Sequence, residues 1–185
     1  MPQDLAESSA PPWELTDLEL PALERHVAAL GARPFHARQV FAWVYRRGVA
    51  DLHAMTDLSR PLRERLAGVC SIATPAIAGR EVSSDGTTKY LLTLADGRQV
   101  ESVYIPDTPK QTFCISTQVG CAMKCAFCLT GKMGLVRNLR PGEIVGQVRV
   151  LARDLGLLDT PFNLVLMGMG EPLHNYDHTM AALRI

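Results

Sequence analysis

The chain has 185 residues, 47% of them hydrophobic, and its 19 basic and 19 acidic side chains cancel. A chain of this length buries about 70% of its unfolded surface, so its fold does not depend on disulfides. No apolar run approaches the roughly 18 residues that would suggest a membrane span. The polar, acidic start lacks the basic and apolar regions of a signal peptide. We therefore expect a flexible leader over residues 1–14 of a cytoplasmic protein with free thiols and no membrane partner.

Residues 15–70 are expected to form a small helical domain. In "LPALERHVAALG" the leucines and valine recur at helical spacing, and Gly31 suits the left-handed residue that follows a helix. The segments "PFHARQVFAWVYRRG" and "LSRPLRERLAG" repeat this pattern. We expect them to close at Gly48 and Gly68, with Ser59 as the N-cap of the second. Three short helices are too small to be the catalytic part, so this domain is expected to be accessory.

The neutral total charge hides an asymmetry between neighbouring segments. Residues 1–32 carry six acidic side chains against Arg25, whereas residues 33–65 carry seven arginines against three acidic side chains, with four aromatic residues interleaved. Such arginines could pair with RNA phosphates while the aromatics stack on unpaired bases. Alternatively, they form a solvated helix face above a core of those aromatics, which is the commoner role of a charge run. The candidates for phosphate contacts are Arg38, Arg46, Arg47, Arg63 and Arg65.

Residues 71–110 are expected to form a β-hairpin linker. The strand candidates "TKYLLTL" and "RQVESVYIP" flank a short turn at 95–97 that contains a glycine. On an alternating strand Glu101 shares a face with Val103. If that face is covered, burial raises the pKa of the Glu101 carboxyl, whereas if Val100 points inward instead, Glu101 lies in water. The alternation leaves both possibilities open.

Residues 111–185 alternate strand, loop, helix and strand, which indicates a βαβ unit. The strand candidates are "TFCIS" and "FNLVLMG", and "PGEIVGQVRVLARDLG" places six apolar residues on one helical face. In parallel sheets and α/β barrels, functional sites lie at the carboxyl ends of the strands. The cysteine-rich loop that begins at Cys121 and the segment "GMGEP" both follow strands. We therefore expect them to share one rim.

Three of the five cysteines, Cys121, Cys125 and Cys128, lie in the short stretch "GCAMKCAFCL". An odd number of cysteines argues against a disulfide framework, and both structural zinc sites and self-contained iron–sulfur cubanes use four ligands. Three thiolates leave one iron of a 4Fe-4S cluster open to a ligand. With this C-x3-C-x2-C spacing and Phe127 before the last cysteine, the loop resembles the signature of the radical S-adenosylmethionine (SAM) superfamily. The alternatives are a chance grouping and a zinc site whose fourth ligand lies elsewhere.

The second motif is "MGMGEP", residues 167–172, which we call the glycine–glutamate segment. Its glycines let the backbone approach a ligand closely, and Glu171 can accept hydrogen bonds from an ammonium group. Taken alone, the segment could equally be a plain turn. One crossover away from the cysteine loop, it resembles the segment that holds the amino group of SAM in that superfamily. The resemblance makes Gly170 and Glu171 the expected SAM contacts.

Longer stretches make the resemblance more specific. The runs "VESVYIPDTPKQTFCISTQVGCAMKCAFCLTGKMGLVRNLRPGEIVGQV", "LVLMGMGEPLHNYDH" and "FHARQVFAWVYRRGVADLHAMTDLS" are similar to the RNA methyltransferases that methylate carbon 2 of adenine in ribosomal and transfer RNA. The similarity covers about residues 15–185. It implies an α/β fold in which a helical domain and a β-hairpin precede the first part of a radical SAM barrel, 111–185. It also implies a 4Fe-4S cluster, SAM, RNA substrates and an electron donor such as flavodoxin, and we expect a monomer.

The same resemblance implies roles for individual residues. The three loop cysteines would hold the cluster, and Glu101 would accept a proton from an adduct between enzyme and RNA. Cys114 would release the product through a transient disulfide, and an accessible thiol near a cationic cluster would have a lowered pKa. Cys70 has no such context and is expected to be a small buried hydrophobe.

The end of the sequence departs from the family pattern. After "YDHTMAALRI" the barrel would continue, and no cysteine follows Cys128 that could carry the methyl group. We expect either a fragment of a longer protein or a chain that cannot complete the reaction. Two other functions remain open: a different radical SAM enzyme, such as one that methylates carbon 8 of adenine, and a non-catalytic RNA- or metal-binding module.

Overall fold

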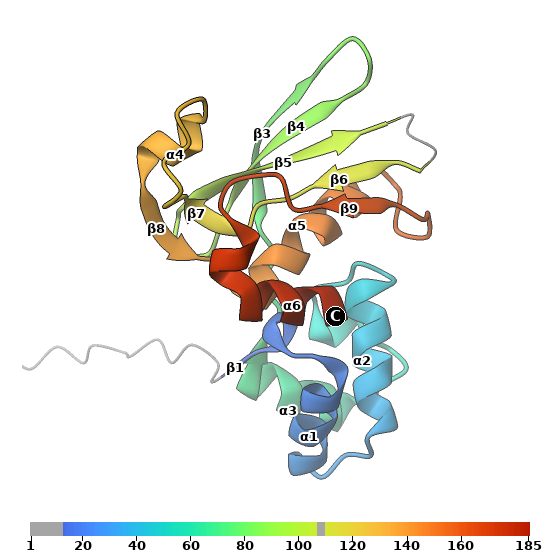
Figure 1. Cartoon of the computed structure of the whole chain (residues 1–185). Helices are drawn as coiled ribbons and strands as arrows, with labels where there is room; N and C mark the ends of the chain where they lie inside the picture. Colours follow the sequence, from blue (N-terminus) through green and yellow to red (C-terminus); the bar gives the residue numbers. More distant parts are fainter. Residues whose placement is uncertain (1–12, 107–109) are drawn as a thin grey trace, which may run out of the picture.

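Two hydrophobic cores organise the computed structural model, which describes residues 13–106 and 110–185. One core lies within a helical domain and the other lies between a sheet and its covering helices. Figure 1 shows the helical domain against one side of the sheet domain, with α5 and α6 between the sheet and the helices below. The expected α/β fold is confirmed. No helix of the described residues has the length and apolar character needed to cross a membrane.

The helical domain consists of short elements whose apolar stripes converge. Its elements are β1 (Trp13–Glu14), η1 (Leu15–Asp17), α1 (Leu20–Ala29), α2 (Phe35–Tyr45), η2 (Leu52–Ala54), α3 (Arg60–Val69) and β2 (Cys70–Ser71). Leu23, Val40 and Leu66, one from each α-helix, are completely buried in the shared core. The helices form because every third or fourth residue can enter this core.

Several details of this domain differ from the sequence-based expectations. Gly31 and Gly48 have positive φ after α1 and α2, as expected, but Gly68 lies inside α3, so the prediction that this glycine closes the helix is wrong. Ser59 occupies the N-cap position of α3, yet its side chain makes no capping hydrogen bond. The expected leader, 1–14, lies outside the described residues except for Trp13 and Glu14. These two pair with β2 in parallel and belong to the domain.

The sheet has five strands in the order β3-β4-β5-β6-β9. Their bounds are β3 (Ala76–Val82), β4 (Thr88–Thr93), β5 (Gln99–Ile105), β6 (Thr112–Cys114) and β9 (Asn163–Val165). The pairs from β3 to β6 are antiparallel, and β6 pairs with β9 in parallel. The β4–β5 hairpin and the βαβ unit are therefore confirmed. Strand β3 was not predicted, because its residues are mostly exposed and show no alternation of buried and exposed side chains.

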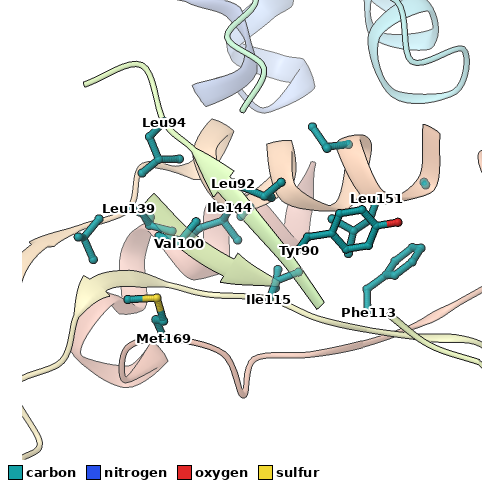
Figure 2. Packing of buried hydrophobic residues seen from close by; sticks show 14 residues of the cluster. Tyr90, Leu92, Leu94, Val100, Phe113, Ile115, Leu139, Ile144, Leu151 and Met169 are labelled. Carbon is teal, nitrogen blue, oxygen red and sulfur yellow. The ribbon is translucent and has the colours of Figure 1, made fainter. Parts of the chain in front are cut away.

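One face of the sheet is covered by α5 (Pro141–Asp154) and α6 (Tyr176–Arg184). Figure 2 shows Tyr90, Val100 and Phe113 of the sheet meeting Ile144 and Leu151 of α5. All five side chains are buried. The periodic apolar face predicted for this helix is therefore the face that packs on the sheet.

A small antiparallel pair of strands lies beside the sheet and carries the cysteines. It is formed by β7 (Gln118–Gly120) and β8 (Leu135–Asn138), with α4 (Leu129–Met133) between them. The last short helix, η3 (Pro172–Asn175), precedes α6. In Figure 1 the connection that contains α4 extends from this pair at the edge of the molecule.

Hydrogen bonds and ion pairs join the two domains at α5 and α6. The Asp17 carboxylate accepts from the Gly142 N–H at 2.9 Å and pairs with Arg140 at 3.1 Å. A Cβ atom at Gly142 would lie 2.8 Å from the carbonyl carbon of Thr16, so the close approach of η1 to α5 needs a glycine here. Burial raises the pKa of Asp17 despite these hydrogen bonds.

Candidate functional site

The cysteine loop and the glycine–glutamate segment lie on one rim, as their positions after strands predict. Hydrogen bonds between backbones connect the segment after β6 to the segment after β9. Ile115 N–H donates to Val165 O (3.0 Å), Gly168 N–H donates to Ile115 O (3.1 Å), and Thr117 N–H donates to Met169 O (2.8 Å). The chain thus reaches the cysteine loop directly alongside the glycine–glutamate segment.

The glycines of the glycine–glutamate segment permit a close approach, but the atoms that approach them belong to other parts of the protein and not to a ligand. A Cβ atom at Gly168 would lie 2.7 Å from the carbonyl of Ile115, and one at Gly170, where φ is +102°, would lie 2.7 Å from the backbone nitrogen of Gln118. Glu171 N–H donates to the side-chain oxygen of Gln118 at 2.9 Å. The Glu171 carboxylate accepts from Leu173 N–H at 3.1 Å and so caps η3. Contact of Gly170 and Glu171 with SAM remains a prediction.

Backbone contacts hold the cysteine loop at both ends. Cys121 N–H donates to Gly134 O, and Cys128 N–H donates to Cys125 O, each at 3.1 Å. Lys124, between the first two cysteines, has φ +52°, an unusual conformation for a residue with a side chain. A Cβ atom at Gly131 would lie 3.0 Å from Cys125 N, so the short helix α4 packs tightly on the loop.

The structure does not gather the three thiols into an assembled metal site. Cys121 is 7% exposed, Cys125 and Cys128 are half-buried, and all five cysteines of the chain are free. Within 13–106 and 110–185, no three His, Cys, Asp or Glu side chains form a group that could hold a metal ion. The expected cluster ligands therefore remain predictions.

The chemistry of this donor set nevertheless fits iron–sulfur ligation. The ligand in such sites is the thiolate. Hydrogen bonds from the backbone of Gly131 and from Thr130 lower the pKa of Cys128, which favours its thiolate form. Three thiols on one eight-residue loop are also close in sequence, as ligands of one cluster would be.

Glu101 and Cys114 occupy the face of the sheet opposite α5. Val100 and Ser102 are buried on the side of the sheet that α5 covers, whereas the Glu101 side chain is 50% exposed. Of the two possibilities that the alternation left open, the one in which Glu101 is covered is therefore wrong within the described part of the chain. Val103 pairs with Cys114 across β5 and β6, which places Cys114 on the same face as Glu101. The two expected catalytic groups thus share one surface.

A lysine that sequence analysis overlooked lies beside Glu101. Lys89 Nζ on β4 lies 3.7 Å from a Glu101 oxygen and 3.2 Å from a Glu81 oxygen on β3. These carboxylates raise the pKa of Lys89, with Glu81 the larger cause. The alternation of "TKYLLTL" puts Lys89 on the polar face, but only the register between strands shows which carboxylates it reaches.

The environment of Cys114 opposes the expected lowering of its pKa. The thiol is half-buried, and burial raises its pKa above the ordinary value of 9.0, although a hydrogen bond from the Met167 N–H partly offsets this effect. The protein groups around Cys114 thus do not supply the expected lowering, which was attributed to a nearby cluster and stays a prediction. The contact with Met167 places Cys114 at the start of the glycine–glutamate segment.

A buried glutamine that the sequence analysis missed organises this rim. Gln147 of α5 accepts from Ser116 N–H and from Ser102 Oγ, both at 2.8 Å, and donates to Ser116 O at 2.8 Å. It therefore fixes the turn of the chain after β6. The only signal in the sequence is one polar residue within the apolar face of the predicted helix.

The arginines of the helical domain are only partly available to a ligand. Arg38 pairs with Glu24 at 3.1 Å, Arg65 donates to Leu30 O at 2.6 Å, and Arg63 donates to the carbonyl of His53. The guanidinium of Arg47 lies 4.1 Å from the centre of the Trp43 ring, and Arg46 is exposed. Cys70 is buried, as expected, and burial raises its pKa to about 12.

Comparison with known proteins shows similarity along nearly the whole chain. Residues 13–72 match the family model of the ribosomal RNA large subunit methyltransferase N-terminal domain. The chain is 50% identical over 176 residues to the dual-specificity RNA methyltransferase RlmN of Anaeromyxobacter dehalogenans (strain 2CP-C), which covers 92% of this chain and 47% of the relative. It is 46% identical over 182 residues to RlmN of Halorhodospira halophila (strain DSM 244 / SL1), covering 97% of this chain and 50% of that protein.

A solved structure gives the same result for the fold. The crystal structure of a radical SAM methyltransferase from Sphaerobacter thermophilus matches with a TM-score of 0.84 and 43% sequence identity, over 94% of this chain and 52% of that one. The chain thus spans about half the length of the relatives it matches. By sequence, the chain is similar to about half of the dual-specificity RNA methyltransferases, and its fold is similar to about half of a radical SAM methyltransferase.

Proposed function

We propose that this chain forms the cluster-binding and SAM-binding part of a cytoplasmic enzyme that methylates carbon 2 of adenine in ribosomal and transfer RNA. The observation that carries this proposal is the convergence of four features. The cysteine loop, the glycine–glutamate segment and Cys114 meet at one rim, and Glu101 lies on the sheet face that Cys114 shares. The names of the relatives support the RNA methyltransferase activity.

In this proposal the cofactors are held by two segments of the chain. Cys121, Cys125 and Cys128 are the cluster ligands, and Gly170 and Glu171 contact SAM. A 4Fe-4S cluster with SAM supplies radical chemistry when bound. The electron comes from a separate protein donor such as flavodoxin.

The chain's own groups would then handle protons and thiols. Glu101 is the proton acceptor, and its carboxylate is oriented by Lys89 at 3.7 Å. Cys114 acts as the thiol that frees the product. Its raised pKa keeps it in the neutral, less nucleophilic form until a base removes its proton.

A chimera tests this proposal. The matching half of the Anaeromyxobacter relative would be replaced by this chain, and nucleosides from RNA exposed to the purified, anaerobically reconstituted chimera would be analysed by mass spectrometry. We expect 2-methyladenine in ribosomal and transfer RNA, and none after Cys125→Ala. Glu101→Gln should leave SAM cleavage intact while a covalent adduct of protein and RNA accumulates, because only the deprotonation step loses its base. A folded, cluster-loaded chimera that produced no 2-methyladenine, or produced 8-methyladenine, would refute the proposal.

A further inference from the structure

A cleft of about 460 Å³ lies between the helical domain and α5, on the side of the sheet that α5 covers. It is bordered by Gly48 after α2, by residues 74–77 leading into β3, and by the last two turns of α5. The side chains of Arg149, Arg153 and Asp154 line it. The proposed catalytic face lies on the other side of the sheet, so the function above does not use this cleft.

Arg149 is a buried cation that pairs with no anion within residues 13–106 and 110–185. The residue is 6% exposed, and its guanidinium donates to Ala73 O at 3.2 Å and to Thr74 Oγ1 at 3.4 Å. Its Nε–H, also buried, has no hydrogen-bond partner among the residues that the structure describes. Burial lowers the pKa of Arg149, which reflects the unfavourable loss of water around the charge. A buried charge of this kind is normally compensated by an anion.

Arg153 adds a second cation one helical turn later on α5. It is exposed, and its guanidinium donates to Gly48 O at 3.4 Å. Across the described parts of the chain, neither Arg149 nor Arg153 forms an ion pair. Residues four apart on a helix are neighbours on one face, and both Arg149 and Arg153 line the same cleft.

The nearby carboxylates are engaged by other groups. Asp154 pairs with Arg80 at 2.9 Å and accepts from Tyr90 at 2.7 Å. Glu14, whose charge also acts on Arg149, accepts hydrogen bonds from Thr16, Ser71 and Ala73. Glu14 does not line the cleft, and Asp154, which does, is neutralised by Arg80. Arg149 and Arg153 are therefore the unpaired charges among the described lining residues, and planar guanidinium groups are suited to phosphate oxygens.

We propose that this cleft binds one backbone phosphate of RNA, with Arg149 and Arg153 as its donors. This inference rests on the proposed function, which makes RNA the substrate. Two observations favour a phosphate within RNA over a free anion. The cleft has the volume of a site for a nucleotide-sized ligand. The exposed Arg46 and Arg47 immediately precede Gly48, so the basic surface continues from the cleft along the end of α2.

The test measures RNA binding by the 185-residue chain as a function of salt. Fluorescence anisotropy with a labelled RNA stem-loop would compare the wild type with Arg153→Gln, an exposed position whose change should not disturb folding. We expect weaker binding and a log–log salt slope that is shallower by about 0.7 to 0.9, the contribution of one phosphate contact. Arg98→Gln is the matched control, because Arg98 is a half-exposed arginine beside Asp96 in the β4–β5 turn, outside the cleft. It should leave both values almost unchanged.

A second measurement avoids mutation of the buried arginine. The Nε–H signal of Arg149 would be followed by NMR during titration with the RNA and, separately, with inorganic phosphate. We expect a shift with RNA that is lost in Arg153→Gln.

RNA binding that Arg153→Gln leaves unchanged would refute the cleft inference and leave the proposed function standing. A shift with inorganic phosphate but not with RNA would refute the RNA assignment, and failure of the wild type to bind any RNA would count against the proposed function itself.

Discussion

Glu101 on β5 and Cys114 on β6 lie on the same face of the sheet, on neighbouring antiparallel strands. Val103, two residues after Glu101, is the register partner of Cys114, so the two groups are diagonal neighbours on this face. Both groups face away from α5, whose contacts bury the alternate residues. A substrate that approaches this face can therefore meet a carboxylate and a thiol together, as the proposed reaction requires.

The cysteine loop should bind a 4Fe-4S cluster when the chain is reconstituted anaerobically with iron and sulfide. We expect about one cluster per chain, measured by iron and sulfide analysis and by visible absorption, because three thiolates on one loop suit this cubane. Cys125→Ala should abolish it. Cys70→Ala, which removes a buried thiol of the helical domain, should leave it intact. Zinc bound without sulfide would contradict the prediction.

The Cys114 thiol should be slow to alkylate in the metal-free chain. Because burial raises its pKa in the folded state above the ordinary 9.0, a smaller fraction is thiolate at a given pH than in the unfolded chain. Its alkylation rate, followed by mass spectrometry of the labelled peptide, should reach half its maximum above pH 9.0. The same peptide in urea supplies the unfolded reference. A folded-state midpoint below that reference would show that the hydrogen bond from Met167 outweighs burial.

Gly170→Ala should destabilise the fold by about 1–3 kcal/mol, the usual cost of a strained backbone conformation. The added Cβ would lie 2.7 Å from Gln118 N, and φ is +102°, which residues with side chains rarely adopt. Urea unfolding followed by circular dichroism measures the change.

Gly68→Ala provides the contrast to that substitution. Gly68 lies within α3, and a Cβ atom there would meet no described residue within 4 Å. Alanine should therefore stabilise the chain by about 0.5–1 kcal/mol, because it has the higher helix propensity. If Gly170→Ala and Gly68→Ala changed the free energy of unfolding by the same amount, the structure would be contradicted at one of these positions.

Arg137→Met should destabilise the chain by about 1.5–3 kcal/mol, the range for hydrogen bonds to charged groups. Arg137 on β8 contacts both oxygens of the nearly buried Glu143, at 2.8 and 2.9 Å, and also pairs with Asp96 at 2.8 Å. Without it, the Glu143 carboxylate keeps its burial but loses its main ionic partner. Arg98→Gln tests the specificity of the effect, since its half-exposed pair with the same Asp96 should contribute little. Similar losses for both variants would argue against the Glu143 contact as the cause.

Helices were predictable where one apolar face meets one core. The pattern of α5 indicated both its extent and its packing face, and Gly31 was recognisable as the residue after α1. In contrast, β3 has no alternation because neither face is covered, and β7 and β8 are too short to produce a pattern. Gly68 resembles a helix end in sequence, yet α3 ends one residue later, at Val69.

The site was predictable where its residues are close in sequence or follow adjacent parallel strands. This explains why the shared rim of the cysteine loop and the glycine–glutamate segment could be anticipated. The orientation of Glu101 could not, because alternation along a strand is symmetrical until the covering helix is known. The cleft at Arg153 also could not be predicted from the sequence. Gly48, whose carbonyl accepts from Arg153, lies 105 residues earlier, and no local pattern links the two.

Asp17 belongs to the helical domain, yet its carboxylate accepts a hydrogen bond from the N–H of Gly142 in the first turn of α5, the helix that covers the sheet. The first N–H groups of any helix need acceptors outside it. Separating the two domains would therefore leave α5 without this acceptor and would expose the surfaces of η1 and α5 that now meet. We expect heat to melt the two domains in a single cooperative transition. The helical domain then behaves as part of a rigid frame, so that an RNA held by one domain has a fixed orientation relative to the sheet of the other.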